Sequence, residues 1–254
     1  VDLNFINRAT KGVYELGSVF KTFTVAAGLE EGLINTDTEF LNLEKRLQCG
    51  KSSISEYDNK IPSDLTVEQI LIRSGNIGSV RIGQKLEIIK LKAFLEKIGI
   101  LSKINFDIEE VGEPIPFKWG KCKLATVSFG HGITTTPLQL AKAYAIISNG
   151  GFAVEPSLIK NELKNYQKKK RIIKAGISEK INPILRKIVT TKEGTAGFVN
   201  IEGYEVGGKT GTAQKTIVGG YSKAKVNTFA GIFPASNPKY VLIVLLDEPK
   251  TSSD

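Results

Sequence analysis

The last fifth of the chain restricts its fold most, because it reads as three consecutive strands separated by short links. The strand-like segments span 203–215, 226–233 and 240–246, and the second link contains a turn at 236–238. Strands joined by so few residues pair antiparallel, since a parallel pair needs a long crossover connection. The sequence therefore predicts an antiparallel sheet in this region.

The first three quarters of the chain predict helices instead. The stretch Ser18–Leu29 is apolar around most of its circumference and stops before Gly32, which is typical of a buried helix. Helices followed by an antiparallel sheet define an α+β fold. Capping pairs and glycine stops predict three further helices: one from Thr66 and Gln69 to a break at 74–76, one over 87–98, and one from Thr136, Pro137 and Gln139 to 149–151.

The composition fits an ordinary globular core in one large domain or two small ones. Hydrophobic residues make up 41% and charged residues 24% of 254 residues, which excludes a disordered, collagen-like or disulfide-rich chain. The longest apolar run, 241–246, is far shorter than the roughly 20 residues of a membrane-spanning helix. Cys49 and Cys122 allow either one disulfide or two free thiols, and their spacing predicts no metal site.

The chain is basic, with 35 Lys and Arg against 26 Asp and Glu and a net charge of +9. The most basic segment is Lys168–Arg171, within the polar stretch 161–174. This segment lacks interleaved aromatic residues and a known binding motif, so we interpret it as a solvated surface and predict no nucleic-acid partner.

Lys21 is the one charged residue between Ser18 and Leu29, on a helix that otherwise reads as buried. Burying an ammonium group is costly, so Lys21 is expected to be paired, to reach the surface or to lose its proton. Ser18 lies one helical turn earlier on the same face. A lysine with a lowered pKa can take the proton of a serine hydroxyl and activate it as a nucleophile. The alternative is that Ser18 caps the helix and Lys21 points to solvent.

Two further patterns favour the catalytic interpretation. Ser74, Gly75 and Asn76 stand at the end of a predicted helix, where a hydroxyl and a carboxamide can face one cleft. Lys209–Thr212 lies on the first strand of the predicted sheet, where Gly211 lets a ligand backbone approach closely. Each pattern alone is common, but the three in this order are specific.

Together these motifs resemble the penicillin-binding proteins, in particular the transpeptidase domain of the class B, division-type enzymes. The resemblance extends over nearly the whole chain. It implies a transpeptidase domain over 1–254, with an antiparallel sheet flanked by helices and an all-helical subdomain, and without the family's membrane anchor, pedestal domain and C-terminal helix. The segments that also match the family are 14–21, 74–78, 129–132, 136–140, 207–213 and 234–238.

The resemblance implies a peptidoglycan D,D-transpeptidase. Ser18 would attack a stem peptide ending in D-Ala-D-Ala, release D-Ala and form an acyl-enzyme, which the amine of a second stem peptide resolves. Lys21 would be the base and Ser74 would relay the proton to the leaving amine. β-Lactam antibiotics would be trapped on Ser18. No cofactor or metal is implied.

The remaining motif residues would bind the substrate. Asn76 would hold the substrate amide, while Lys209, Thr210, Gly211 and Thr212 would bind its terminal carboxylate. The backbone N–H groups of Ser18 and Thr212 would form the oxyanion hole. The family further implies an extracytoplasmic site of action, a parent protein anchored by an N-terminal segment, and partners among cell-wall synthesis or division proteins that contact other regions.

Three other functions stay open at this point. A serine β-lactamase shares the motifs but needs a group that positions a deacylating water, and the sequence shows no such carboxylate in a recognisable motif. A penicillin-binding sensor domain would acylate once and signal. A P-loop at 203–210 is disfavoured, because strand-like residues and too few positions follow it. His131, in a glycine turn, is interpreted as structural.

Overall fold

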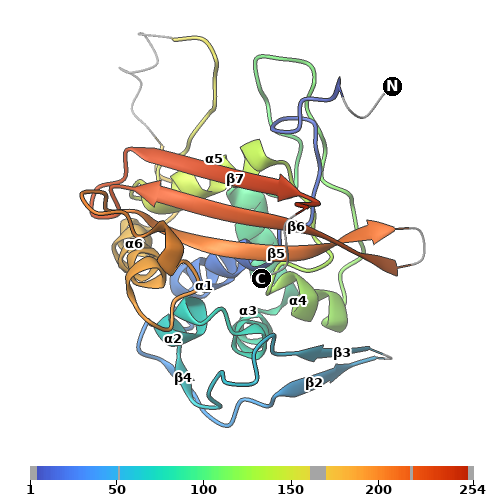
Figure 1. The fold of residues 1–254 in the computed structure, drawn as a ribbon, viewed down its shortest axis with the longest axis vertical. Coiled ribbons are helices and arrows are strands. Elements are labelled where there is room, and N and C mark those ends of the chain that lie inside the picture. The colour runs from blue at the N-terminus through green and yellow to red at the C-terminus, as the bar shows by residue number, and fades with distance from the viewer. Residues whose placement is uncertain (1–4, 51, 161–169, 218–219, 251–254) are drawn as a thin grey trace.

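The computed structural model describes residues 5–50, 52–160, 170–217 and 220–250, and it confirms the α+β fold. Its main sheet consists of β5 (Gly207–Ile217), β6 (Gly220–Phe233) and β7 (Tyr240–Asp247), in that order and antiparallel throughout. In Figure 1 the sheet lies across the upper half of the molecule, with α1 to α4 below it. The predicted sheet is confirmed, although β5 begins at Gly207 rather than at residue 203.

A buried helix lies beneath the sheet. The 3-10 turn η2 (Gly17–Phe20) continues directly into α1 (Lys21–Glu30), and every residue of α1 is buried. Phe23 of α1 packs edge-on against Phe20 and Tyr144, with ring centroids 5.3 and 5.4 Å apart. The predicted buried helix is thus confirmed, and it places Ser18 and Lys21 under β5.

Two predicted helix starts are confirmed by their caps. In α2 (Val67–Ile72) Thr66 and Gln69 exchange both capping hydrogen bonds, and in α5 (Pro137–Ser148) Thr136 and Gln139 do the same. Two helices were not predicted from the sequence. They are α4 (Lys121–Val127) and α6 (Ala175–Thr190), and α6 packs against β5.

The helix predicted over 87–98 is present as the second half of α3 (Asn76–Lys97). This element consists of two helical segments that meet at a kink at Glu87, where φ is 59° and ψ is 173°, and the first segment was not predicted. The first segment contains Gly78 and Gly83, and glycine disfavours a helix. A Cβ at Gly78 would lie 2.6 Å from Ile70, and one at Gly83 would lie 1.8 Å from Ser128 Oγ, so both glycines mark sites of close helix packing.

Two small sheets, which the sequence analysis did not predict, accompany the lower helices. β1 (Glu39–Phe40) pairs with β4 (Leu65–Thr66), and β2 (Arg46–Cys49) forms a hairpin with β3 (Ser52–Ser55). A disulfide joins Cys49 at the end of β2 to Cys122 in α4, which decides between the two states left open for these cysteines. A short 3-10 turn, η4 (Gly197–Val199), precedes β5.

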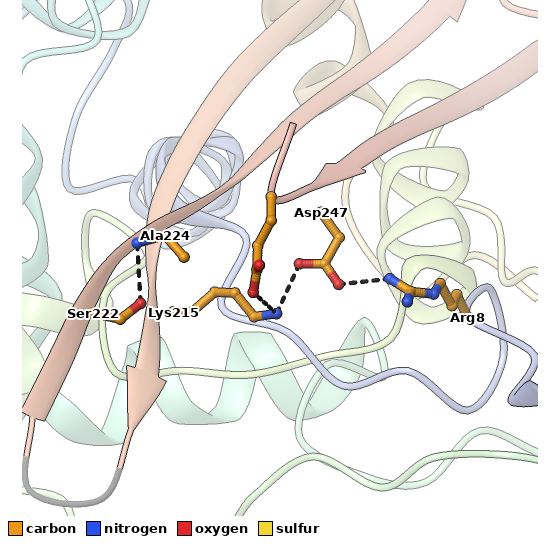
Figure 2. Close-up of polar contacts among 6 residues, drawn as sticks. Arg8, Lys215, Ser222, Ala224 and Asp247 are labelled. Atoms are coloured by element: carbon orange, nitrogen blue, oxygen red, sulfur yellow. Dashed lines mark hydrogen bonds and ion pairs between the residues drawn. The ribbon is translucent and has the colours of Figure 1, made fainter. Parts of the chain in front are cut away.

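Charged side chains fasten the N-terminal segment to the sheet. Arg8 Nη1 lies 2.6 Å from Asp247 Oδ2, and Lys215 Nζ lies 3.0 Å from Asp247 Oδ1 and 2.7 Å from Glu248 Oε1, as Figure 2 shows. This network links three segments that are remote in sequence, ahead of the turn that carries Ser18.

The basic segment Lys168–Arg171 is only partly visible, because Lys168 and Lys169 lie outside the described residues. Lys170 and Arg171 are exposed, as expected for a solvated surface; the Arg171 guanidinium also lies 4.5 Å from the ring centre of Phe152, and its Nε donates to Gly150 O. In the part of the chain that the structure describes, no helix has the length and apolarity needed to cross a membrane.

Candidate active site

A cavity of about 500 Å³ opens between η2, the turn at 74–76 and β5. It brings the sequence-predicted site residues together: most line its wall, while Lys21 and Lys209 are fully buried beside it. The predicted site residues in the wall are Ser18, Ser74, Asn76, Thr210, Gly211 and Thr212.

Two glycines allow the turn that carries Ser18 to touch β5. Gly17 has a φ of +64°, and a Cβ there would lie 2.5 Å from Thr212 O. A Cβ at Gly211 would lie 2.2 Å from Leu16 O. The missing side chain at Gly211 therefore makes room for the chain's own backbone. Gly211 also forms part of the cavity wall. This contact sets the backbone of Thr212 beside Ser18.

Lys21 is held by the turn at 74–76. Its Nζ donates to Ser74 O at 2.5 Å, to Asn76 Oδ1 at 2.7 Å and to Ser74 Oγ at 3.2 Å. Burial lowers the pKa of Lys21 from 10.5 to about 7, and the negative charge of Glu56 opposes this shift. Among the described residues no hydrogen bond joins Lys21 to Ser18, so the turn at 74–76 fixes the amine next to the nucleophile's helix.

Lys209 approaches the same serine from the sheet. Its Nζ donates to Ser74 Oγ at 2.8 Å and to Thr210 O at 3.0 Å. Burial, and then the positive charge of Lys21, hold the pKa of Lys209 well below its usual value. The Ser74 hydroxyl thus accepts from two amines that repel each other when both are protonated. This arrangement favours neutral lysine and can pass a proton through Ser74.

The sequence analysis missed several residues of the site. Thr195 Oγ1 lies 2.7 Å from Thr210 Oγ1, and Tyr57 and Phe129 stand in the cavity wall. His131, interpreted as structural, also lines the cavity, and its ring stacks between Phe129 and Tyr221. Thr195, Tyr57 and Tyr221 belong to none of the motifs read from the sequence, whereas Phe129 and His131 lie in the family-matching segment 129–132, to which no site role was assigned.

Glu15 is the acidic residue beside His131, which lines the cavity. Its Oε2 accepts from Gly132 N at 3.0 Å and lies 3.7 Å from His131 Nδ1. Burial lowers the pKa of His131, which favours its neutral form. Within the described residues no group of three or more His, Cys, Asp or Glu side chains is placed to hold a metal ion.

A buried amine of lowered pKa, a second amine and a serine hydroxyl between them, all beside a half-buried serine, can carry out acyl transfer. The family comparison agrees with this chemistry. The model of the penicillin-binding protein transpeptidase domain matches residues 2–254, and the chain belongs to this family. The predicted family is thereby confirmed, and the P-loop interpretation is wrong, since β5 continues as a strand through Lys209 and Thr210.

Relatives and solved structures support the same class. The chain is 30% identical to the probable peptidoglycan D,D-transpeptidase FtsI of Caulobacter vibrioides (98% of this chain, 44% of that protein) and 32% identical to the probable peptidoglycan D,D-transpeptidase PenA of Neisseria flavescens (96% and 60%). It thus spans about half the length of these relatives.

Among solved structures, the apo transpeptidase domain of Burkholderia pseudomallei penicillin-binding protein 3 matches with a TM-score of 0.88 at 26% identity, over 96% of this chain and 74% of that one. Penicillin-binding protein 3 of Mycobacterium tuberculosis, complexed with aztreonam, matches with a TM-score of 0.86 at 26% identity, over 96% and 59%. These proteins share the fold of this chain, which brings its Ser18, Lys21 and Lys209 close together.

Proposed function

We propose that residues 1–254 form one transpeptidase domain, which cross-links peptidoglycan stem peptides through an acyl-enzyme on Ser18. The observation that carries the proposal is the position of Ser18 in a cavity beside Ser74, whose hydroxyl is hydrogen-bonded to both buried lysines. The relatives from Caulobacter and Neisseria, both probable peptidoglycan D,D-transpeptidases, support the same activity.

Acylation begins with the neutral form of Lys21, which its lowered pKa makes available near neutral pH. Lys21 takes the hydroxyl proton of Ser18 as Ser18 Oγ attacks the carbonyl of the penultimate D-Ala. The backbone N–H groups of Ser18 and Thr212 stabilise the oxyanion. The proton then passes through Ser74 to the leaving amine, the peptide bond breaks, and D-Ala departs.

Deacylation reverses these roles with a different nucleophile. The neutral amine of a second stem peptide attacks the ester carbonyl, and Lys21 accepts the proton that the new amide nitrogen loses. The bond from the carbonyl carbon to Ser18 Oγ breaks, and Lys21 returns the proton to Ser18. The products are a cross-linked peptide and free enzyme. The proton lost by the attacking amine is the one that Ser18 regains, so the step consumes no other proton.

Substrate binding involves polar groups on both sides of the cavity. Asn76 lines the cavity and uses Oδ1 for Lys21 and one hydrogen of Nδ2 for Ser55 O, so one N–H and one lone pair remain available to hold the substrate amide. Lys209, Thr210, Gly211 and Thr212 receive the terminal carboxylate. Thr195 orients the Thr210 hydroxyl for this contact.

β-Lactams act on the same serine in this proposal. The Mycobacterium tuberculosis homologue forms a complex with aztreonam, and a β-lactam ring would acylate Ser18 as the peptide does. The Cys49–Cys122 disulfide supports an extracytoplasmic location, because disulfides persist in oxidising compartments. The same location would give access to peptidoglycan and to other proteins that build it.

The test is acylation by a fluorescent penicillin, followed by intact mass. We expect one adduct per chain, and none in Ser18→Ala. An equal adduct in Ser18→Ala, or none in wild-type protein that melts cooperatively, would contradict the proposal. Incubation with a peptide ending in D-Ala-D-Ala distinguishes the alternatives: release of D-Ala supports a transpeptidase, rapid penicillin hydrolysis indicates a β-lactamase, and acylation without D-Ala release indicates a sensor.

A further inference from the structure

Three consecutive residues, Ser55, Glu56 and Tyr57, hold the turn at 74–76 from outside the motif. Ser55 O accepts from Asn76 Nδ2 at 2.8 Å, and Tyr57 OH donates to Arg73 O at 2.8 Å. The two oxygens of Glu56 accept from consecutive backbone N–H groups at the start of α3. The turn is therefore held by one short segment at the end of β3.

Glu56 closes the N-terminus of α3. Its Oε2 accepts from Asn76 N at 2.7 Å and its Oε1 from Ile77 N at 2.9 Å. The N-cap residue of this helix, Gly75, has no side chain to do so. A carboxylate at a helix N-terminus is also favoured by the helix dipole. Glu56 therefore replaces a local cap, and it does so next to the site.

This cap fixes two of the three oxygen atoms that accept hydrogen bonds from Lys21. Asn76 Oδ1 and Ser74 O each accept a hydrogen bond from Lys21 Nζ. Ser74 has a φ of 57°, a conformation that non-glycine residues rarely adopt and that its surroundings must hold in place. The two bonds from α3 to Glu56 add to those from Ser55 and Tyr57 and to the turn's own backbone bonds, from Ser74 N to Leu71 O and from Gly75 N to Ile70 O.

Glu56 also contributes charge. Lys21 is fully buried, and two charged groups act on it: Glu56 from the segment after β3, and Lys209 from β5, which shares Ser74 Oγ with it. Burial lowers the pKa of Lys21, and the Glu56 carboxylate raises it against that larger effect. The state of the amine thus reflects a balance to which one acidic residue contributes.

We propose that Glu56 is a positioning residue of the acyl-transfer site: it fixes the turn at 74–76 over Lys21 and supplies the negative charge that faces this lysine. The proposal rests on the function proposed above. Under this proposal Glu56, which belongs to none of the motifs, controls the pH range in which the site is active.

The test substitutes Glu56→Gln, which keeps the shape and one acceptor oxygen but removes the charge. The rate of acylation by a fluorescent penicillin is measured from pH 5 to pH 9. Loss of the negative charge makes protonated Lys21 less stable, so the acid limb of the profile is expected to move to lower pH by on the order of one unit. Loosening of the turn is expected to lower the plateau roughly tenfold.

Three matched variants separate charge from support. Glu44→Gln removes a carboxylate that also contacts α3, at Arg81 (2.5 Å), and should leave the profile unchanged. Tyr57→Phe removes a bond to the turn without removing charge, so it should lower the plateau and leave the acid limb in place. Glu56→Asp keeps the charge and should restore most of the wild-type acid limb.

A direct titration makes the test independent of acylation. NMR of the lysine Cε signals, with Lys21 assigned through Lys21→Met, should show the Lys21 midpoint falling in Glu56→Gln. An unchanged midpoint, or a lower plateau with the acid limb in place, would overturn the proposal and leave Glu56 as a helix cap. Wild-type protein that does not acylate, but in which the midpoint falls as expected, would refute the proposed function and not the action of Glu56 on Lys21.

Discussion

At the residue scale, the amines of two buried lysines converge on one serine hydroxyl. Lys21 and Lys209 are each fully buried, and Ser74 Oγ accepts from both. Lys21 has three acceptors for its three hydrogens, but hydrogen bonds offset only part of the desolvation of a charge. The folded protein therefore gives up stability to keep an amine that can act as a base.

This cost predicts how stability depends on pH. The pKa of Lys21 is about 7 in the folded state and 10.5 in an exposed chain, so between these values the unfolded state binds more protons. Stability must then rise with pH across this window. Chemical unfolding between pH 7 and pH 9 should show a slope that Lys21→Met reduces by up to about 1.4 kcal/mol per pH unit.

The control for this prediction is Lys92→Met on the exposed side of α3, where the lysine side chain is 47% exposed and pairs with Glu96. It should leave the slope as it is in the wild-type protein. Equal slopes in wild-type protein and Lys21→Met would mean that Lys21 keeps an ordinary affinity for protons in the folded state.

The sequence made part of this site visible. Lys21 was conspicuous because it is the one charge between Ser18 and Leu29, and the structure shows it both hydrogen-bonded and desolvated. Glu56 was not visible, because it stands in an ordinary polar segment and its two partners are backbone N–H groups. Contacts of a side chain with distant backbone leave no pattern in a single sequence.

At the element scale, the site depends on how closely β5 approaches η2. Leu16 O occupies the place of a Cβ at Gly211, and Gly17 is in turn close to Thr212 O. No side chain lies between the two backbones at this point. Any atom added here must push the strand that carries Lys209 away from the turn that carries Ser18.

The substitution Gly211→Ala tests this contact. Its Cβ would lie 2.2 Å from backbone oxygen, so strand or turn must shift. We expect a loss of about 1–3 kcal/mol in the free energy of unfolding, as for overpacked cores. We expect a fall of about a hundredfold in the acylation rate, because the oxyanion donors separate. Thermal melting and the fluorescent penicillin assay measure the two effects.

Gly197→Ala is the matched control, because a Cβ there meets nothing within 4 Å. It should leave both the melting temperature and the acylation rate unchanged. If Gly211→Ala acylates as fast as Gly197→Ala, the close approach of β5 to η2 is not required for the reaction.

Elements differed in how far sequence could predict them. Caps at Thr66 and Thr136 gave two helix starts, since capping is local chemistry. The first half of α3 was missed, because Gly78 and Gly83 lower helix propensity. Those glycines are used for contact with Ile70 and Ser128, and such packing becomes apparent only in the folded molecule.

At the scale of the whole molecule, one covalent link encloses much of the lower half. The Cys49–Cys122 disulfide joins residues 73 positions apart, with Cα atoms separated by 5.4 Å. The enclosed segment includes α2, α3 and the turn at 74–76. Both cysteines also line a cavity of about 480 Å³ that shares Asn76, Phe129 and His131 with the site. The link thus stabilises the part of the fold that holds the base.

Removal of this link is expected to weaken folding more than catalysis. A disulfide that closes a long loop restricts the unfolded chain and adds about 2–4 kcal/mol of stability. The double substitution Cys49→Ser with Cys122→Ser should therefore lower the urea midpoint by roughly 1 M. At 25 °C its acylation rate should stay within about threefold of wild type, because Lys21 keeps its partners Ser74 and Asn76. A reductant should shift the wild-type midpoint to that of the double variant and leave the variant unchanged; a wild-type midpoint that ignores the reductant would show that the link adds no stability.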